Sequence, residues 1–274
     1  VSAPLKVQWF GCTDRGRLRP NNEDAFLGVQ FDAQEVHHLG KHGEASCAEH
    51  DHVFAVSDGM GGAKAGEYAS SIAVEKITAL LPRSFRRTTT GAGVDVPAVL
   101  TELFRQTHRA LKYLGSSYAE CQGMEATLSL CWLMPGRLHF AHVGDSRIYR
   151  VEAGTGRMTQ LTEDDTYVGW LFRNGKLNER EARTHPRRNV LQRALGGDNQ
   201  FVDPQVGEVP VNAGDTLVLC TDGLVDGLYN EQVLELLGEA STTAGGINQA
   251  ERLVREAITR GSRDNVTAQV VRLD

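Results

Sequence analysis

The chain has 274 residues, of which 41% are hydrophobic and 23% charged, with a formal net charge of −6. This composition is typical of a globular protein that buries a sizeable core, and the acidic balance argues against a nucleic-acid partner. With no apolar run of about 18 residues, no signal-peptide pattern and five scattered cysteines without a CxxC pair, we expect no membrane span, reduced thiols and a cytoplasmic location.

Short apolar runs rich in β-branched and aromatic residues predict strands. In chain order these are residues 6–12, 25–31, 52–57, 126–133, 137–143, 146–152, 216–220 and 266–273. Helical spacing of apolar residues predicts three amphipathic helices, over 69–81, 100–114 and 247–258. Because the strands come in consecutive groups, the pattern favours an α+β sandwich of antiparallel sheets over a doubly wound parallel sheet.

Two polar stretches separate these elements. Residues 86–97 predict a loop between helices, and residues 34–52 predict a long loop between two strands. The second stretch carries His37, His38, His42, His50 and His52. A zinc-binding module is an alternative for this stretch, but the histidine spacing matches no known zinc pattern, so a solvated loop is preferred.

Acidic residues recur where the predicted strands meet loops. Glu23 and Asp24 precede one strand, and Asp264 precedes another by one residue, whereas Asp58 and Asp222 follow strands. A sandwich of two sheets can gather such strand ends at one edge. Singly, each motif is typical of a turn or a solvated loop; their joint occurrence points to a cluster of carboxylates.

Hard divalent cations such as Mg²⁺ and Mn²⁺ prefer oxygen ligands of this kind. Asp58 can bridge two ions, and Gly59 beside it leaves its carbonyl accessible to one of them. Four carboxylates, at Glu23, Asp58, Asp222 and Asp264, total −4, which two divalent ions neutralise.

A phosphate dianion at such a centre needs one more cation. Arg19, four residues before Glu23, is placed to supply it, because a guanidinium fork binds two phosphate oxygens at once. Alone, an arginine at this position is more often a surface charge.

Five motifs in this order resemble the metal-dependent protein phosphatase family, also called PPM or type 2C: RPNNED, DGMGG, GDSR, TDG and RDNVT. The bacterial Ser/Thr phosphatase branch is also similar in TEDDTYV and in the HP…LQRALG stretch between residues 162 and 196. The resemblance runs from about Gly11 to Leu273. It implies one phosphatase domain over residues 1–274, folded as a four-layer α-β-β-α sandwich, with a flap at about 163–198.

The resemblance also implies roles for single residues. Arg19 matches the family's phosphate-binding arginine. Glu23, Asp58 and the Gly59 carbonyl would hold one metal ion, and Asp58, Asp222 and Asp264 the other, with Asp58 bridging.

Three further residues complete the site that the resemblance implies. Asp24 and Asn265 would orient metal-bound water. Asp145, in GDSR at a predicted turn between two strands, would help Asp222 to hold a weaker third ion, although a hairpin aspartate that bonds its own backbone is the simpler interpretation.

The sequence departs from the family pattern at two places. Met60 stands where animal-type relatives carry a histidine proposed as proton donor, which leaves a metal-bound water or another group such as His185 for that role. Glu125 and Ala126 stand where the bacterial branch commonly has glycine and threonine.

The implied activity is metal-dependent hydrolysis of phosphoserine and phosphothreonine in proteins by a metal-activated water. No cysteine is followed by an arginine six residues later, so a cysteine-dependent phosphatase is excluded. The alternatives are a catalytically silent metal-binding regulator and a phosphatase of small phosphoesters. We expect a monomer whose partners are phosphorylated proteins and, in bacterial relatives, often a cognate Ser/Thr kinase.

Overall fold

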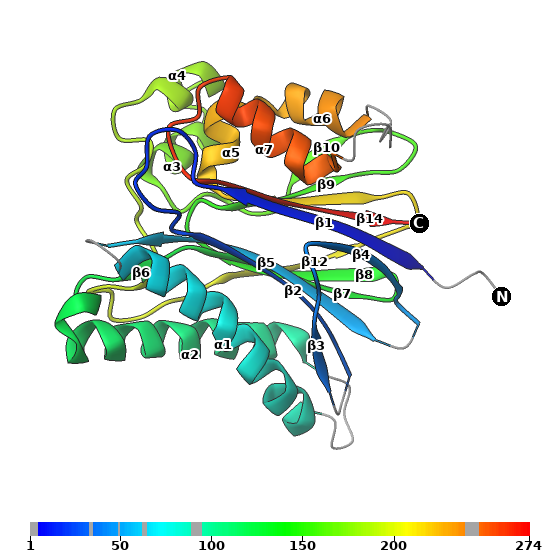
Figure 1. Cartoon of the computed structure of the whole chain (residues 1–274), viewed down its shortest axis with the longest axis horizontal. Helices are drawn as coiled ribbons and strands as arrows, with labels where there is room; N and C mark the ends of the chain where they lie inside the picture. The colour runs from blue at the N-terminus through cyan, green and yellow to red at the C-terminus, as the bar shows by residue number, and fades with distance from the viewer. Residues whose placement is uncertain (1–4, 33–34, 49, 62–64, 89–94, 239–246) are drawn as a thin grey trace.

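Two antiparallel β-sheets stack face to face, and helices cover both outer surfaces (Figure 1). The computed structural model describes residues 5–32, 35–48, 50–61, 65–88, 95–238 and 247–274. Helices α1 and α2 lie on one sheet, and α5, α6 and α7 lie on the other (Figure 1). The expected α-β-β-α layering is therefore confirmed.

The first sheet has six strands in the order β10-β9-β13-β14-β1-β4. Their bounds are β1 Lys6–Asp14, β4 His42–Ser46, β9 Arg147–Val151, β10 Met158–Gln160, β13 Thr216–Cys220 and β14 Val266–Leu273. The first and last long strands of the chain, β1 and β14, are neighbours inside this sheet.

The second sheet has eight strands, ordered β11-β6-β5-β7-β8-β12, with β2 paired to β5 and β3 paired to β2. Their bounds are β2 Asp24–Phe31, β3 Val36–His38, β5 Asp51–Met60, β6 Glu125–Ala126, β7 Leu128–Met134, β8 Arg137–Val143, β11 Leu195–Gly196 and β12 Gln205–Pro210.

The helices are α1 Ala65–Thr88, α2 Val96–Ser117, α3 Tyr167–Arg173, α4 Glu179–Thr184, α5 Asp222–Gly227, α6 Asn230–Gly238 and α7 Gln249–Thr259, with a short 3₁₀ turn η1 at Ala119–Cys121. Side-chain caps fix several starts: Asp95 accepts from the backbone N–H of Ala98 at α2, and Asn248 accepts from that of Glu251 at α7.

Three separate apolar cores stabilise the four layers. One lies between α1, α2 and the eight-stranded sheet and includes Leu103 and Trp132. A second fills the space between the sheets around Phe54 and Leu219, and a third, around Leu253, lies under α5, α6 and α7. The candidate metal ligands lie at one edge of the core between the two sheets.

The predicted strands and the three amphipathic helices are confirmed, with the run 126–133 divided between β6 and β7. The predicted last helix was wrong at its start, because Asn248 caps it and Ile247 is exposed. The strands β10, β11 and β12 and helices α5 and α6 were missed, because segments this short carry too few apolar positions to show a period, whereas α3 and α4 lie in the flap that the resemblance implied. Of the predicted loop 86–97, residues 89–94 lie outside the described part of the chain.

The prediction of a loop over residues 34–52 is wrong for most of that stretch. It contains β3 and β4, and β4 extends the six-stranded sheet by pairing with β1. Trp9 on β1 explains this order, since its indole Nε1 donates to the Gly40 carbonyl at 3.0 Å and its ring covers Gly43. The outward side chains of these edge strands are polar and face water, so the sequence shows no apolar run that would predict a strand here.

We predict that Trp9→Ala destabilises the fold by about 3–5 kcal/mol, because it removes a large buried ring and the anchor of β4. The free energy of unfolding in urea measures this change. Tyr113→Ala, on the exposed face of α2, is the control and should change stability by less than about 0.5 kcal/mol. Equal effects of the two substitutions would show that the 34–52 region is not anchored by Trp9.

Candidate metal centre

Five aspartates from distant parts of the chain meet at one edge of the sandwich. Asp24 and Asp58 are directly paired across β2 and β5, so their side chains share a face of the sheet. Asp58 lies inside β5, which continues to residue 60, rather than after the strand as predicted. Asp145 lies in the turn between β8 and β9, Asp222 begins α5, and Asp264 comes just before β14.

Burial and mutual repulsion perturb these carboxyl groups. The pKa of Asp58 is raised well above its ordinary value, first by burial and then by the charges of Asp24, Asp222, Asp145 and Asp264. The pKa of Asp222 is likewise raised by burial and by Asp145 and Asp264. Burial raises the pKa of Asp145 to about 7. Like charges held this close make the site a strong attractor of cations.

The donor set fits a hard divalent ion. In the described part of the chain, no side chain donates a hydrogen bond to the carboxylate of Asp58 or Asp222, so these oxygens are free to ligate. Yet no three described His, Cys, Asp or Glu side chains stand close enough together to enclose one ion. Closing a ligand shell therefore requires the carboxylates to move together, against the repulsion that a cation would remove.

Asp24 is held differently from the other carboxylates. Its Oδ2 accepts hydrogen bonds from the hydroxyls of Thr221 and Thr267, both at 2.7 Å. Burial raises its pKa to about 7, and these two hydrogen bonds oppose that rise. The two threonines belong to the TDG and RDNVT motifs, and sequence reasoning missed them because it assigned roles in those motifs only to Asp222, Asp264 and Asn265.

Glu23 lies against the first turn of α1. The Gly59 N–H donates to the Glu23 carbonyl at 3.0 Å, and a Cβ added to Gly66 would meet the Glu23 carboxylate at 2.7 Å. A Cβ on Gly59 would meet the Gly66 carbonyl at 1.9 Å. The two glycines thus let β5 and α1 approach closely enough to position Glu23 near the helix N-terminus, where a negative charge is favoured.

Asn265 holds the loop that carries Glu23. Its Oδ1 accepts from the Glu23 N–H at 2.8 Å, and its Nδ2 donates to the carbonyls of Arg15 and Asn21 at 2.9 and 2.8 Å. Both N–H donors of its amide are therefore taken by the backbone. The role of Asn265 in orienting metal-bound water stays a prediction, and it would use the Oδ1 atom, since a metal-bound water donates and an amide oxygen can accept a second hydrogen bond.

Arg19 pairs with one of the candidate ligands. Its Nη2 donates to Asp264 Oδ2 at 2.5 Å, while the Asp264 Oδ1 accepts from the backbone N–H of Asn265. The Arg19 side chain is 49% exposed and borders a hollow with Pro20, Glu23 and Gly61. The pKa of Arg19 is raised, chiefly by this hydrogen bond, so the guanidinium is charged and reachable from solvent.

Thr127 fixes the backbone of Asp58. The Asp58 N–H donates to the Thr127 hydroxyl at 2.9 Å, and the Thr127 N–H donates to the Asp58 carbonyl at 2.8 Å. The Thr127 hydroxyl also lies 2.7 Å from that of Ser146, next to Asp145. A buried pair of hydroxyls therefore links the strand that carries Asp58 to the turn that carries Asp145.

The segment 163–198, which we call the flap, borders the site. Between α3, α4 and α5 lies a cavity of about 420 Å³ whose lining includes Asp145, Asp222, Val168 and Arg188. Arg147, two residues after Asp145, donates from Nε and Nη2 to the carboxylate of Asp164. The flap is thereby attached directly beside the edge of the sandwich where the five aspartates meet, which we call the aspartate edge.

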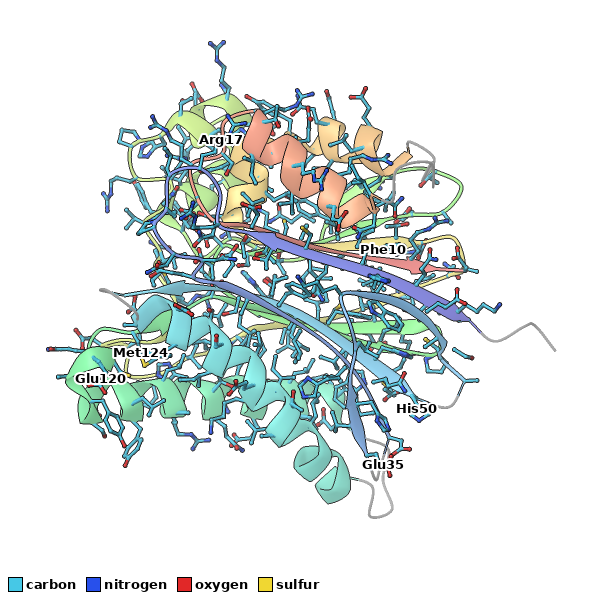
Figure 2. The ribbon with its side chains drawn as sticks, in the orientation of Figure 1. Phe10, Arg17, Glu35, His50, Glu120 and Met124 are labelled. Carbon is cyan, nitrogen blue, oxygen red and sulfur yellow. The ribbon has the colours of Figure 1, made fainter. Side chains whose placement is uncertain are left out.

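Neither histidine alternative lies in this site. Figure 2 shows Glu35 and His50 at the opposite end of the molecule from Arg17, which belongs to the loop that carries Arg19. His185 ends α4, where its Nδ1 accepts from the backbone N–H of Arg187 at 3.1 Å. His185 thus contacts the backbone at the end of its own helix, and His50 lies away from the aspartates.

Comparison with known proteins agrees with this architecture. The sequence profile described as protein phosphatase 2C matches residues 41–256. The serine/threonine phosphatase stp of Listeria monocytogenes is 31% identical over 96% of this chain and 94% of its own. The serine/threonine protein phosphatase PstP of Mycobacterium tuberculosis is 32% identical over 97% of this chain, which spans only 45% of that relative.

Solved structures have the same fold. The catalytic domain of the phosphatase PstP in complex with two manganese ions superimposes with a TM-score of 0.73 at 29% identity, over 98% of this chain and 99% of that one. A sandwich of this layering with acidic strand ends at one edge defines the PPM class of phosphatase folds. The chain belongs to the protein phosphatase 2C family.

We predict that Mn²⁺ stabilises the protein increasingly as pH rises from 5 to 8. With chelator, the raised pKa values of Asp24 and Asp145, about 7 in each case, mean that the folded state binds more protons than the unfolded chain, so stability falls as pH rises through that range. Bound ions favour the deprotonated carboxylates and reverse this loss.

At a free Mn²⁺ concentration about 100 times Kd, each site adds about 2.7 kcal/mol, or roughly 5–10 °C in Tm at this size. Melting curves with Mn²⁺ and with EDTA across pH measure the difference, and Asp222→Asn should reduce it. A Tm difference that is constant across pH would contradict the prediction.

Proposed function

We propose that this chain is one phosphatase domain that hydrolyses phosphoserine and phosphothreonine in proteins with the help of divalent ions. The observation that carries the proposal is the set of carboxylates at Asp58, Asp145 and Asp222, whose pKa values are raised first by burial and, for Asp58 and Asp222, also by the charges of neighbouring aspartates. Burying like charges without donors is unfavourable unless cations compensate them. Relatives named as Ser/Thr phosphatases, one of them described with two manganese ions, support the same assignment.

In this proposal Glu23, Asp58, Asp222 and Asp264, with the Gly59 carbonyl, hold two Mg²⁺ or Mn²⁺ ions. When bound, the ions supply an activated water and neutralise charge on the phosphate. The family relationship supports a weaker third ion at Asp145 and Asp222. Asp24, fixed by its two threonines, would orient metal-bound water beside this cluster.

Arg19 is the proposed phosphate ligand. Its guanidinium is charged and half-exposed beside Glu23 and Asp264. A phosphate dianion can accept two parallel N–H bonds from it in place of the Asp264 carboxylate. Arg19 would then hold the phosphoryl group in line for attack and stabilise its equatorial oxygens.

The proposal extends to partners and setting. Phosphorylated proteins are the substrate class, and a cognate Ser/Thr kinase that makes them is the natural partner. We also propose a monomer that works in the cytoplasm. Among the described residues, no helix is long and apolar enough to cross a bilayer.

The direct test is phosphate release from a phosphothreonine peptide with Mn²⁺ and then with excess chelator. We expect turnover to require the ion, and Asp222→Asn and Asp264→Asn each to lower kcat by about 100-fold or more, in line with loss of a group that fixes catalytic charge. Circular dichroism would check that both variants fold. Turnover that survives exhaustive chelation would overturn the metal-dependent mechanism.

We predict that Arg19→Ala weakens substrate binding while the ions remain bound. Its removal deletes a charge-assisted bidentate contact, so KM for the phosphopeptide should rise by about tenfold and inhibition by inorganic phosphate should weaken similarly. Arg17→Ala, in the same loop, is the matched control. An unchanged KM together with unchanged phosphate inhibition would remove Arg19 from the site.

A further inference from the structure

The flap is closed at its base by a narrow neck. Thr166 and Leu191 form an antiparallel bridge, and the Gln192 N–H donates to the Asp165 carbonyl at 2.7 Å. Helices α3 and α4 lie between these two strands of the neck. The chain therefore enters and leaves the flap through one pair of backbone contacts.

Asp165 joins this neck to the turn that carries Asp145. Its N–H donates to the Gly144 carbonyl at 2.6 Å, and its Oδ2 accepts from the Gly144 N–H at 3.0 Å. Its Oδ1 accepts from Arg193 Nη2, on the returning strand of the neck. Asp165 is only 5% exposed, so each of these bonds replaces water that cannot reach it.

The backbone of Gly144 is held in place by its own conformation and by its neighbours. Its φ of +113° is a conformation that favours glycine, and an added Cβ would lie 2.6 Å from Thr127 Cβ. The buried ring of His142 donates from Nε2 to the Gly144 carbonyl at 2.9 Å, because a carbonyl can only accept. The carbonyl thus receives donors from both Asp165 and His142, which fixes the direction in which the next residue leaves.

We propose that Asp165 is a positioning residue that sets the place of Asp145 at the aspartate edge and couples it to the flap. The inference rests on the proposed function, since it assigns Asp145 to the metal site. Asp165 follows directly after Asp164, the ion-pair partner of Arg147. Its own carboxylate is held by Arg193 and does not face Asp58 or Asp222. It acts through the Gly144 backbone, not by contact with the substrate.

A carboxylate is required at this position because its two oxygens bind different partners. An asparagine keeps one acceptor for the Gly144 N–H but loses the charge that pairs with Arg193. An alanine leaves the Gly144 N–H and the Arg193 guanidinium without their acceptor. The variants Asp165→Asn, Asp165→Ala and Arg193→Gln therefore separate the link to the turn from the link to the flap.

Three measurements test the role in the full chain. Mn²⁺ titration by calorimetry reports the weakest binding step, and kcat on a phosphothreonine peptide is compared with kcat on p-nitrophenyl phosphate, whose leaving group needs little protonation. Amide hydrogen exchange over residues 142–146 reports the turn without any need for activity. Glu163→Gln is the matched control, because it breaks a solvent-exposed flap ion pair with Arg173.

We expect Asp165→Ala to weaken the last Mn²⁺ step by about tenfold, as removal of residues that orient metal ligands commonly does. It should slow the phosphopeptide more than p-nitrophenyl phosphate, as Asp145→Ala should, and it should speed amide exchange in the turn. Asp165→Asn should show a smaller change of the same kind. Glu163→Gln should match the wild type in all three measurements.

Wild-type values for Mn²⁺ binding, substrate ratio and exchange in Asp165→Ala would overturn the inference. If Asp165→Ala does not fold, Asp165→Asn and Arg193→Gln decide, and unchanged exchange in both would overturn it equally. If the wild type releases no phosphate from either substrate, the proposed function fails, whereas the exchange measurement still reports whether Asp165 holds the turn.

Discussion

Repulsion among buried carboxylates is the constraint on which the rest of this structure depends. Asp58 is directly paired with Asp24 and also feels the charges of Asp145 and Asp222. Such a group does not assemble on its own, so the sandwich must hold it. Three apolar cores, one on each side of the sheets and one between them, provide the free energy that opposes this repulsion.

The backbone around the edge is fixed by small polar contacts rather than by further charges. Thr127 binds the backbone of Asp58 on both sides, and Thr221 and Thr267 share one oxygen of Asp24. The amide oxygen and both amide N–H groups of Asn265 bind the backbone of the neighbouring loop. These contacts fix the backbone from which the acidic side chains project, so that only the side chains have to move for the carboxylates to close around an ion.

The sequence predicted the long elements well, because they have strong local signals, and the aspartates that it singled out lie together at one edge of the sandwich. Strand β14 has the β-branched run and α7 the helical period that such arguments need. Strands β3 and β4 lacked that signal, because their side chains are mostly exposed and their place depends on backbone pairing with β2 and β1 and, for β4, on Trp9. The role of Asp165 was equally hidden, because it depends on contacts with Gly144 and Arg193 that no local spacing reveals.

The ion pair of Arg19 with Asp264 has a thermodynamic consequence for the proposed activity. Each partner is a proposed ligand, one for phosphate and one for a metal ion, and each is engaged by the other at 2.5 Å. An ion that takes Asp264 releases the guanidinium, and an anion that takes Arg19 releases the carboxylate. Linkage then requires that the two ligands strengthen each other's binding by the same factor. Product inhibition would for this reason deepen as the metal concentration rises.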